Sequence, residues 1–146
     1  MEIRYLSPIH KAFRQISIHF EGPCGALGVS PAEGHLLSYL RRYAPCPISE
    51  ILCVFGQKPS TMTSMLDRLS RGGLVAREMD PGDRRSVRVS LTRKGRVAAG
   101  RVNRLVWDLE ARIDARVGRR DLMGFRAVIA AVEAATGVQV RKERAR

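Results

Sequence analysis

The sequence predicts a mainly α-helical fold of about six helices with one small β-hairpin, arranged as a winged helix-turn-helix. Two observations predict this class. Apolar residues recur at helical spacing in several separate stretches, and one short segment, Ser86 to Leu91, instead alternates apolar and polar residues as a strand does. With 146 residues, of which 45% are hydrophobic, the chain has the length and composition of a single globular domain, residues 1–146.

The first two helices are predicted from one apolar stripe and one start signal. The stripe consists of Ile9, Phe13, Ile16 and Phe20. It predicts a short helix over residues 5–22 that ends at Glu21-Gly22-Pro23. Ser30-Pro31-Ala32-Glu33 then predicts a helix start, with Ser30 as N-cap, Pro31 at the first position and Glu33 closing a capping box. This second helix ends before Ala44.

Two short helices joined by a glycine follow. Residues 48–55 carry apolar side chains at i, i+3, i+4 and i+7, and Gly56 can adopt the positive φ that ends a helix. Pro59 suits the first position of the next helix, which Gly72-Gly73 ends. Its buried stripe consists of Met62, Met65, Leu66 and Leu69. This pattern predicts a helix-turn-helix.

A hairpin and two further helices complete the prediction. Strands are expected over residues 74–77 and 86–91, joined through Pro81-Gly82 in a type II turn. Thr92 caps a long helix of about 25 residues. Its stripe (Ala98, Val102, Leu105, Leu109, Ile113, Val117) leaves Val97 and Trp107 aside, so more than one face is expected to be buried. A last helix carries Leu122, Phe125, Val128, Ile129 and Val132, and residues 138–146 form a basic tail.

Charge and composition narrow the class of function. The net charge of +12 favours a polyanionic partner. The three cysteines form no C-x-x-C pair and the three histidines are scattered, so we expect no disulfide framework, no metal site and no cofactor. No carboxylate pair, nucleophile–base set or phosphate-binding glycine loop indicates an enzyme. Without an export signal or an apolar run near 20 residues, we expect a cytoplasmic protein without a membrane partner.

The outward face of the second motif helix carries short hydroxyls and cations, which hydrogen-bond base edges and phosphates. The residues predicted to contact DNA are Lys58, Ser60, Thr61, Thr63, Ser64 and Arg68. Asp67 is expected to lie beside Arg68 and orient it. Lys58 stands where a capping side chain is usual, which suits a helix end that faces phosphate, although a backbone or water cap would explain it equally.

Over residues 48–96 the chain resembles the MarR family of bacterial transcription regulators. The resemblance rests on the run LDRL-x-x-x-GLV-x-R, the wing D-x-x-D-R-R and the closing V-x-L-T-x-x-G. It implies a DNA-binding lobe over 30–92 and a homodimer formed by helices in 5–22 and 93–137. It also implies that Arg85 enters the minor groove and that Asp83 supports the wing. From their place in the hairpin, we expect Arg84 and Arg88 to contact phosphates or only to aid solubility.

The sequence therefore predicts a homodimeric regulator of double-stranded DNA, a repressor that reads a palindromic site with recognition helices about 34 Å apart. The resemblance implies a small aromatic or lipophilic effector in a pocket. The candidate lining residues are Phe13, Phe20, Tyr39 and Trp107, for which ordinary packing is the alternative. Two other functions stay open: a non-specific architectural DNA-binding protein, and a thiol-based sensor. Against the sensor, Cys24 is expected after the first helix and Cys53 is expected to be buried.

Overall fold

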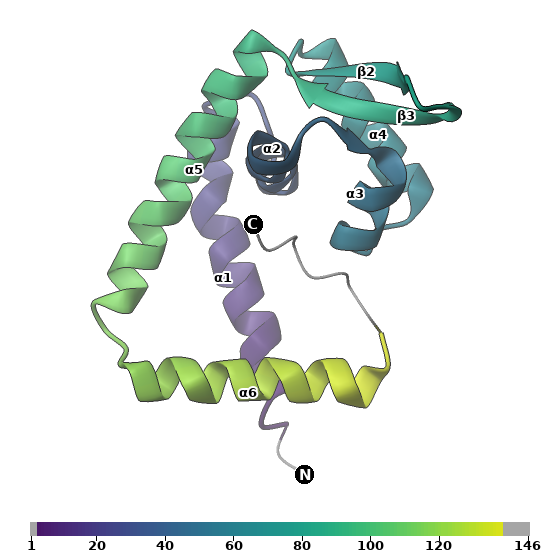
Figure 1. Ribbon diagram of the computed structural model, residues 1–146. Helices are drawn as coiled ribbons and strands as arrows, with labels where there is room; N and C mark the ends of the chain where they lie inside the picture. The colour runs from purple at the N-terminus through teal and green to yellow at the C-terminus, as the bar shows by residue number, and fades with distance from the viewer. Residues whose placement is uncertain (1–2, 139–146) are drawn as a thin grey trace.

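The computed structural model describes residues 3–138 as six helices and a small antiparallel sheet (Figure 1). The predicted basic tail lies outside the described residues except for Val138. The elements are α1 (Leu6–Gly25), α2 (Pro31–Tyr43), β1 (Cys46–Pro47), α3 (Ile48–Phe55), α4 (Pro59–Arg71), β2 (Val75–Asp80), β3 (Asp83–Leu91), α5 (Arg93–Asp114) and α6 (Arg119–Thr136). The mainly α-helical fold with a hairpin wing is confirmed.

The predicted helix signals act as expected. Ser30 and Glu33 form the reciprocal capping box of α2, and the Thr92 hydroxyl accepts a hydrogen bond from the Gly95 amide at the start of α5. Gly56 ends α3 with a φ of 59°. Lys58 begins α4 without any side-chain cap. The helix-turn-helix of α3 and α4 is thus set by local chemistry.

The first helix is longer than predicted and includes Glu21-Gly22-Pro23. Pro23 lacks one amide donor, but the Ala26 amide still reaches the Gly22 carbonyl at 3.0 Å and the helix runs on to Gly25. Phe20 and Cys24 are both buried and lie one turn apart. Packing of this last turn against α2 outweighs the local stop signal.

The sheet has the order β1-β3-β2, and all pairs are antiparallel. The two-residue strand β1 was not predicted; it pairs Cys46 with Val89 and lacks any periodic signal. The predicted type II turn at the hairpin tip is wrong, because Gly82 does not have the positive φ that this turn requires. Instead, the Asp80 carboxylate accepts a hydrogen bond from the Gly82 amide at 2.8 Å.

The core lies in the lobe formed by α2, α3, α4 and the sheet, and the start of α5 packs onto it. Away from this lobe, α1, the far half of α5 and α6 form an open frame (Figure 1). No residue of α6 is buried. Large apolar side chains on the frame are exposed, among them Phe13, Trp107, Leu122, Met123 and Phe125. No helix within residues 3–138 is long and apolar enough to cross a membrane.

Candidate nucleic-acid interface and ligand cleft

The outward face of α4 carries the residues predicted to contact DNA. Its apolar stripe points into the core, where Met62, Met65, Leu66 and Leu69 are almost fully buried. The opposite face leaves all six predicted contact residues exposed: Lys58, Ser60, Thr61, Thr63, Ser64 and Arg68. The sequence therefore places short hydroxyls and a cation near the free N-terminus of the helix, where amide groups favour an anion.

Arg68 lies differently from the prediction. Its Nε donates to Oε1 of Glu33 in α2 at 2.6 Å, although the arginine side chain stays 54% exposed. Asp67, expected to orient Arg68, instead forms an ion pair with Arg77 of β2. The cause is geometry: consecutive helix residues point about 100° apart, so Asp67 and Arg68 reach different neighbouring elements.

Glu33 therefore serves two elements at once. One carboxylate oxygen accepts the Ser30 amide at 2.8 Å, and the other accepts Arg68. Burial alone would raise the pKa of Glu33, but these hydrogen bonds and the charge of Arg68 outweigh it, so the pKa lies below its ordinary value. The N-terminus of α2 and the second half of α4 are joined by one charged contact.

The wing is shaped by Asp80, a residue that the sequence analysis did not single out. Its carboxylate accepts from the Gly82 amide and pairs with Arg88 Nε, and the side chain is nearly buried. The Gly82 hydrogen bond is the main reason that the pKa of Asp80 is lowered, and Arg88 adds to it against the effect of burial. Asp83 has a smaller part, since its Oδ1 accepts the Arg85 amide at 3.0 Å.

Arg84 and Arg85 lie exposed on β3 next to the turn. Neither guanidinium has a hydrogen bond or ion pair to another residue within the described part of the chain. Arg88, by contrast, is tied to Asp80. Two cations thus lie next to the turn of the hairpin with their charged groups unpaired within the described residues.

A cleft of about 900 Å³ lies between the frame helices and the lobe. Its lining includes all four residues proposed from the sequence, Phe13, Phe20, Tyr39 and Trp107, together with Phe55 and Gln57. We call this the aromatic cleft. Phe20 and Tyr39 are buried in its wall, whereas Phe13 is 70% and Trp107 is 64% exposed. The structure therefore brings the four residues together around one space.

Polar side chains of the aromatic cleft are mostly bonded to neighbours. The Tyr39 hydroxyl donates to Oε1 of the buried Glu50 at 3.1 Å, and burial followed by this contact raises the pKa of Tyr39. The Ser38 hydroxyl donates to Oδ1 of Asn103. Gln57 differs, because its Oε1 is buried and no donor within residues 3–138 reaches it.

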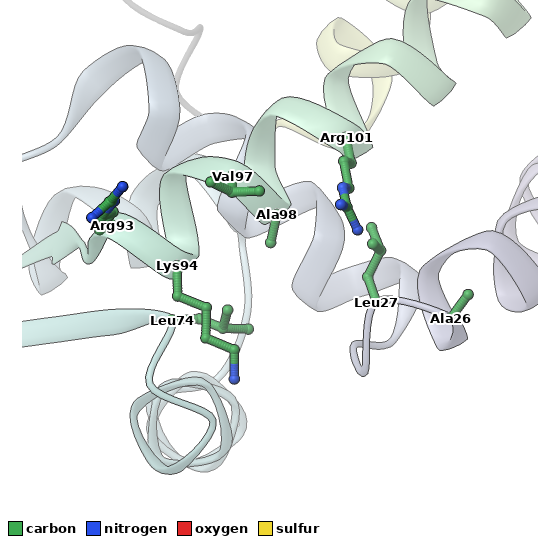
Figure 2. Close-up of a pocket in the computed structure, with 8 residues that line it drawn as sticks. All are labelled: Ala26, Leu27, Leu74, Arg93, Lys94, Val97, Ala98 and Arg101. Carbon is green, nitrogen blue, oxygen red and sulfur yellow. The ribbon is translucent and has the colours of Figure 1, made fainter.

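A second hollow, of about 570 Å³, lies on α5 where that helix meets the end of α1 and Leu74 (Figure 2). We call this the cationic hollow. Its lining residues are Ala26, Leu27, Leu74, Arg93, Lys94, Val97, Ala98 and Arg101. Three of the eight are cations and none is acidic, so the hollow favours anions. Lys94 is already held by the Gly72 carbonyl at 2.9 Å.

The cysteines differ from the prediction. Cys24 belongs to the last turn of α1, where it is buried, and burial raises the pKa of its thiol. Cys46 is also buried, whereas Cys53, expected to be buried, is exposed. It is exposed because the inward face of the short α3 is taken by Ile51 and its neighbours. Within residues 3–138 no three side chains are grouped to hold a metal ion.

Comparison with known protein families adds to this geometry. The model of the MarR family matches residues 29–87. The HTH-type transcriptional repressor MdtR of Bacillus subtilis is 40% identical over 68 residues, which is 47% of this chain and 44% of that protein. The HTH-type transcriptional regulator PecS of Dickeya dadantii is 41% identical over 78 residues, 51% of this chain and 46% of PecS. The chain spans about half the length of the curated relatives it matches.

Solved structures extend the similarity over the frame helices. The MepR protein of S. aureus, solved as a complex with DNA, has a TM-score of 0.84 and 16% identity, covering 92% of this chain and 99% of that one. The reduced form of MarR from E. coli has a TM-score of 0.72 and 26% identity, covering 90% and 98%. The arrangement of α1, α5 and α6 around the winged lobe is shared with these proteins.

Proposed function

We propose that this chain, whose residues 29–87 match the model of the MarR family, is a transcription regulator of that family that binds a specific double-stranded DNA site as a homodimer and acts as a repressor. The observation that carries this proposal is that two surfaces able to contact DNA, the outer face of α4 and the wing, lie on the same lobe. The outer face of α4 exposes hydroxyls and cations, its one carboxylate, Asp67, is paired with Arg77, and the wing presents Arg84 and Arg85 with no protein partner within the described residues. The family consists of regulators, which agrees with the expectation that the chain is not an enzyme.

In this proposal α4 enters the major groove and the wing the minor groove. Thr63 and Ser64 face base edges, Lys58 at the helix start contacts phosphate, and Arg85 inserts beside the wing. Ser60, Thr61 and Arg84 add contacts to the backbone. Arg68 and Arg88 are each held by a carboxylate, so we assign them to shaping the interface as well as to phosphate contact.

The frame helices support a homodimer. Exposed Phe125 and Met123 on α6, at 61% and 63%, belong to a helix that buries nothing within its own chain. Leu122 and Phe125 are three residues apart on one face of α6, and large exposed apolar side chains that share a face mark an interaction surface. A two-fold dimer through the helices in 5–22 and 93–137 would cover these side chains and set two recognition helices on a palindromic site in the cytoplasm.

We further propose that a small aromatic or lipophilic effector enters the aromatic cleft and changes DNA affinity. The cleft lies between frame helices and lobe, and its volume falls within the roughly 300–1,000 Å³ of small-molecule sites. A ligand there can bias DNA binding only if it fits one lobe position better than another.

Selection from a random duplex pool, with and without oxidant, tests the specific function against its alternatives. An enriched inverted repeat is expected; equal binding of all duplexes would support an architectural protein instead. Loss of selection only with oxidant would support thiol sensing.

The wing assignment is tested by Arg85→Ala, with Arg84→Ala at the preceding residue as the matched control. Arg85→Ala should weaken operator binding by about 1–3 kcal/mol, or roughly 5- to 160-fold, while the dimer stays intact. Arg84→Ala should weaken all duplexes by a smaller, equal factor and lower the salt dependence. Unchanged affinity of Arg85→Ala across a salt titration would refute the wing contact.

A further inference from the structure

We propose that the cationic hollow binds the phosphate group of a phosphate ester, with Arg101 as the main contact and with Lys94 and Arg93 adding charge. This chemistry has two sources, the backbone of DNA and a free small phosphate ester, which the two titrations described here separate. The site goes beyond the proposed function, because its lining residues belong neither to the outer face of α4, nor to the wing, nor to the aromatic cleft.

The hollow is built from one face of α5 and two short segments that pack beside it. Lys94, Val97, Ala98 and Arg101 are spaced so that they form one stripe along the helix. The two cations stand at the ends of this stripe, about 10 Å apart along the helix axis, with the two apolar residues between them. Figure 2 shows the Arg101 side chain extending from α5 toward Leu27. A group that enters the hollow therefore meets a cation at each end.

The arginines of the hollow are free to bind a ligand. The guanidinium groups of Arg93 and Arg101 have no hydrogen bond or ion pair within residues 3–138. Other arginines around the same turns are bonded to backbone: Arg41 donates to the carbonyl of Arg96, and Arg96 donates to the carbonyl of Leu91. A free guanidinium keeps its fork of N–H donors, which matches the oxygens of a phosphate group.

The first half of α5 lacks any compensating negative charge. Between Arg93 and Trp107 the sequence has no acidic residue and five cations: Arg93, Lys94, Arg96, Arg101 and Arg104. Like charges at helical spacing repel each other, so an anion seated among them stabilises this segment. A phosphate monoester carries about −1.5 to −2 charges at neutral pH, and a DNA strand carries one at every nucleotide. Either source supplies more negative charge than a single carboxylate.

The apolar part of the lining favours an ester over the bare phosphate ion. Val97 is 56% exposed, whereas Ala98 and Leu74 in the same lining are buried. The carbon atoms of a sugar or of a short alkyl group would cover Val97 while the phosphate lies beside Arg101. Burial of this apolar surface adds to the affinity that the cations provide.

The hollow also adjoins the lobe that is proposed to bind DNA. Lys94 Nζ donates to the carbonyl of Gly72, the residue that follows α4. The start of α5 lies at the same end of the molecule as the wing, away from α6 (Figure 1). A DNA strand that continues past the end of α4 would bring its phosphates to the hollow.

The first titration measures the unfolding midpoint of the full chain with n-butyl phosphate and with pentanoate, at neutral pH and equal ionic strength. The two probes share a butyl chain, and only the first carries phosphate. At ten times its dissociation constant, butyl phosphate should raise the midpoint by about 4–6 °C, and pentanoate should raise it less. Arg101→Gln should weaken binding about three- to tenfold, which reduces the shift to about 30–60% of its size. The matched control, Arg104→Gln, changes an exposed arginine outside the hollow and should keep the full shift.

The second titration measures the affinity of the same proteins for a random duplex and for the selected operator at several salt concentrations. If the phosphate comes from the DNA backbone, Arg101→Gln should weaken both duplexes by the same factor. It should also lower the slope of log affinity against log salt by about 0.9 for each lost phosphate contact. Arg104→Gln should keep the original slope.

The outcomes separate the sources and test the site. A lower salt slope for Arg101→Gln assigns the hollow to the DNA backbone, and a reduced butyl phosphate shift with an unchanged slope assigns it to a free ester. Identical behaviour of Arg101→Gln and Arg104→Gln in both titrations would overturn the proposal. An unchanged slope together with equal shifts from pentanoate and butyl phosphate would overturn it as well. If neither duplex bound, the proposed function would fail, while the butyl phosphate shift would still decide about the hollow. Arg93→Gln replaces Arg101→Gln if the latter does not fold.

Discussion

Replacing Glu33 by glutamine should destabilise the protein at neutral pH and make its stability less dependent on pH. The carboxylate of Glu33 accepts from the Ser30 amide and from Arg68, and the residue is buried. Glutamine keeps one acceptor oxygen but loses the charge and places an amide nitrogen against one of the two donors. The change therefore weakens the α2 cap and the link to α4 at once.

The size of the effect follows from these two contacts. A hydrogen bond to a charged group contributes about 1.5–3 kcal/mol when it is buried, and a capping contact about 1 kcal/mol. Because the Arg68 side chain is 54% exposed, its charged contact must be discounted for solvent screening. We expect a total loss of about 1–2 kcal/mol, or roughly 3–8 °C in the unfolding midpoint of a chain of this size.

The sign of the pH dependence is fixed by the lowered pKa of Glu33. A carboxyl whose pKa is lower in the folded than in the unfolded state stabilises the fold above its ordinary value near 4.3. That contribution disappears as the pH falls through the folded-state value. The difference between the original protein and Glu33→Gln should therefore be large at pH 7 and shrink below about pH 4.

Urea unfolding followed by circular dichroism at one protein concentration and several pH values measures this difference, with the exposed Glu78→Gln as control. The free energy of unfolding of Glu78→Gln should match that of the original protein at every pH. A difference for Glu33→Gln that stayed constant down to pH 3 would refute the charged contact, because a neutral carboxyl and an amide would then differ only in shape.

Two further predictions concern the glycine of the wing–helix junction and the thiols. Gly95→Ala should cost at least about 3 kcal/mol in urea unfolding, since its Cβ would stand 1.9 Å from the Leu74 carbonyl oxygen, whereas Gly25→Ala, with open space around it, should be nearly neutral. Equal urea midpoints for Gly95→Ala and Gly25→Ala would contradict the close approach of Gly95 to the Leu74 carbonyl. In the native protein the exposed Cys53 should react rapidly with iodoacetamide, whereas the buried Cys24 and Cys46 should react only on unfolding. Rapid alkylation of all three thiols would contradict this prediction and show that the lobe opens.

Local signals in the sequence predicted most helix boundaries because their chemistry is complete within four residues. Ser30 to Glu33, Gly56 and Thr92 are of this kind, and the structure forms each of them as expected. The end of α1 was missed since a local stop at Pro23 competes with burial of Cys24 against α2, where a Cβ on Gly34 would lie 3.1 Å from the sulfur. That contact joins residues ten apart through tertiary packing.

The exposed faces of α4 and the wing followed from periodicity, but the partners of their charges did not. Glu33 and Arg68 are 35 residues apart, and no pattern in the sequence indicates which carboxylate each arginine meets. Asp80 could have been noticed, because an aspartate two residues before a glycine at a turn is a frequent cap. Gly95 was part of the quoted motif, yet only its contact with Leu74 explains why glycine stands there.

The aromatic cleft is connected to α4 through two neighbouring segments, α2 and the turn before α4, and this limits how strongly a ligand could act. Pro31, Ala32 and His35 of α2 line the cleft, while Glu33 of the same helix holds Arg68 of α4. Gln57 lies in the cleft wall immediately before α4.

A ligand changes DNA affinity only by the difference in its own affinity for the two lobe positions. If that difference is one neutral hydrogen bond, worth about 0.5–1.5 kcal/mol, the change is roughly two- to twelvefold. A larger response would require α2 to move as well. In that case Glu33→Gln, which loosens the connection through α2, would reduce the ligand's effect on DNA binding without reducing the ligand's affinity for the cleft. An effect of ligand that Glu33→Gln left unchanged would assign the coupling to the Gly56–Lys58 turn alone.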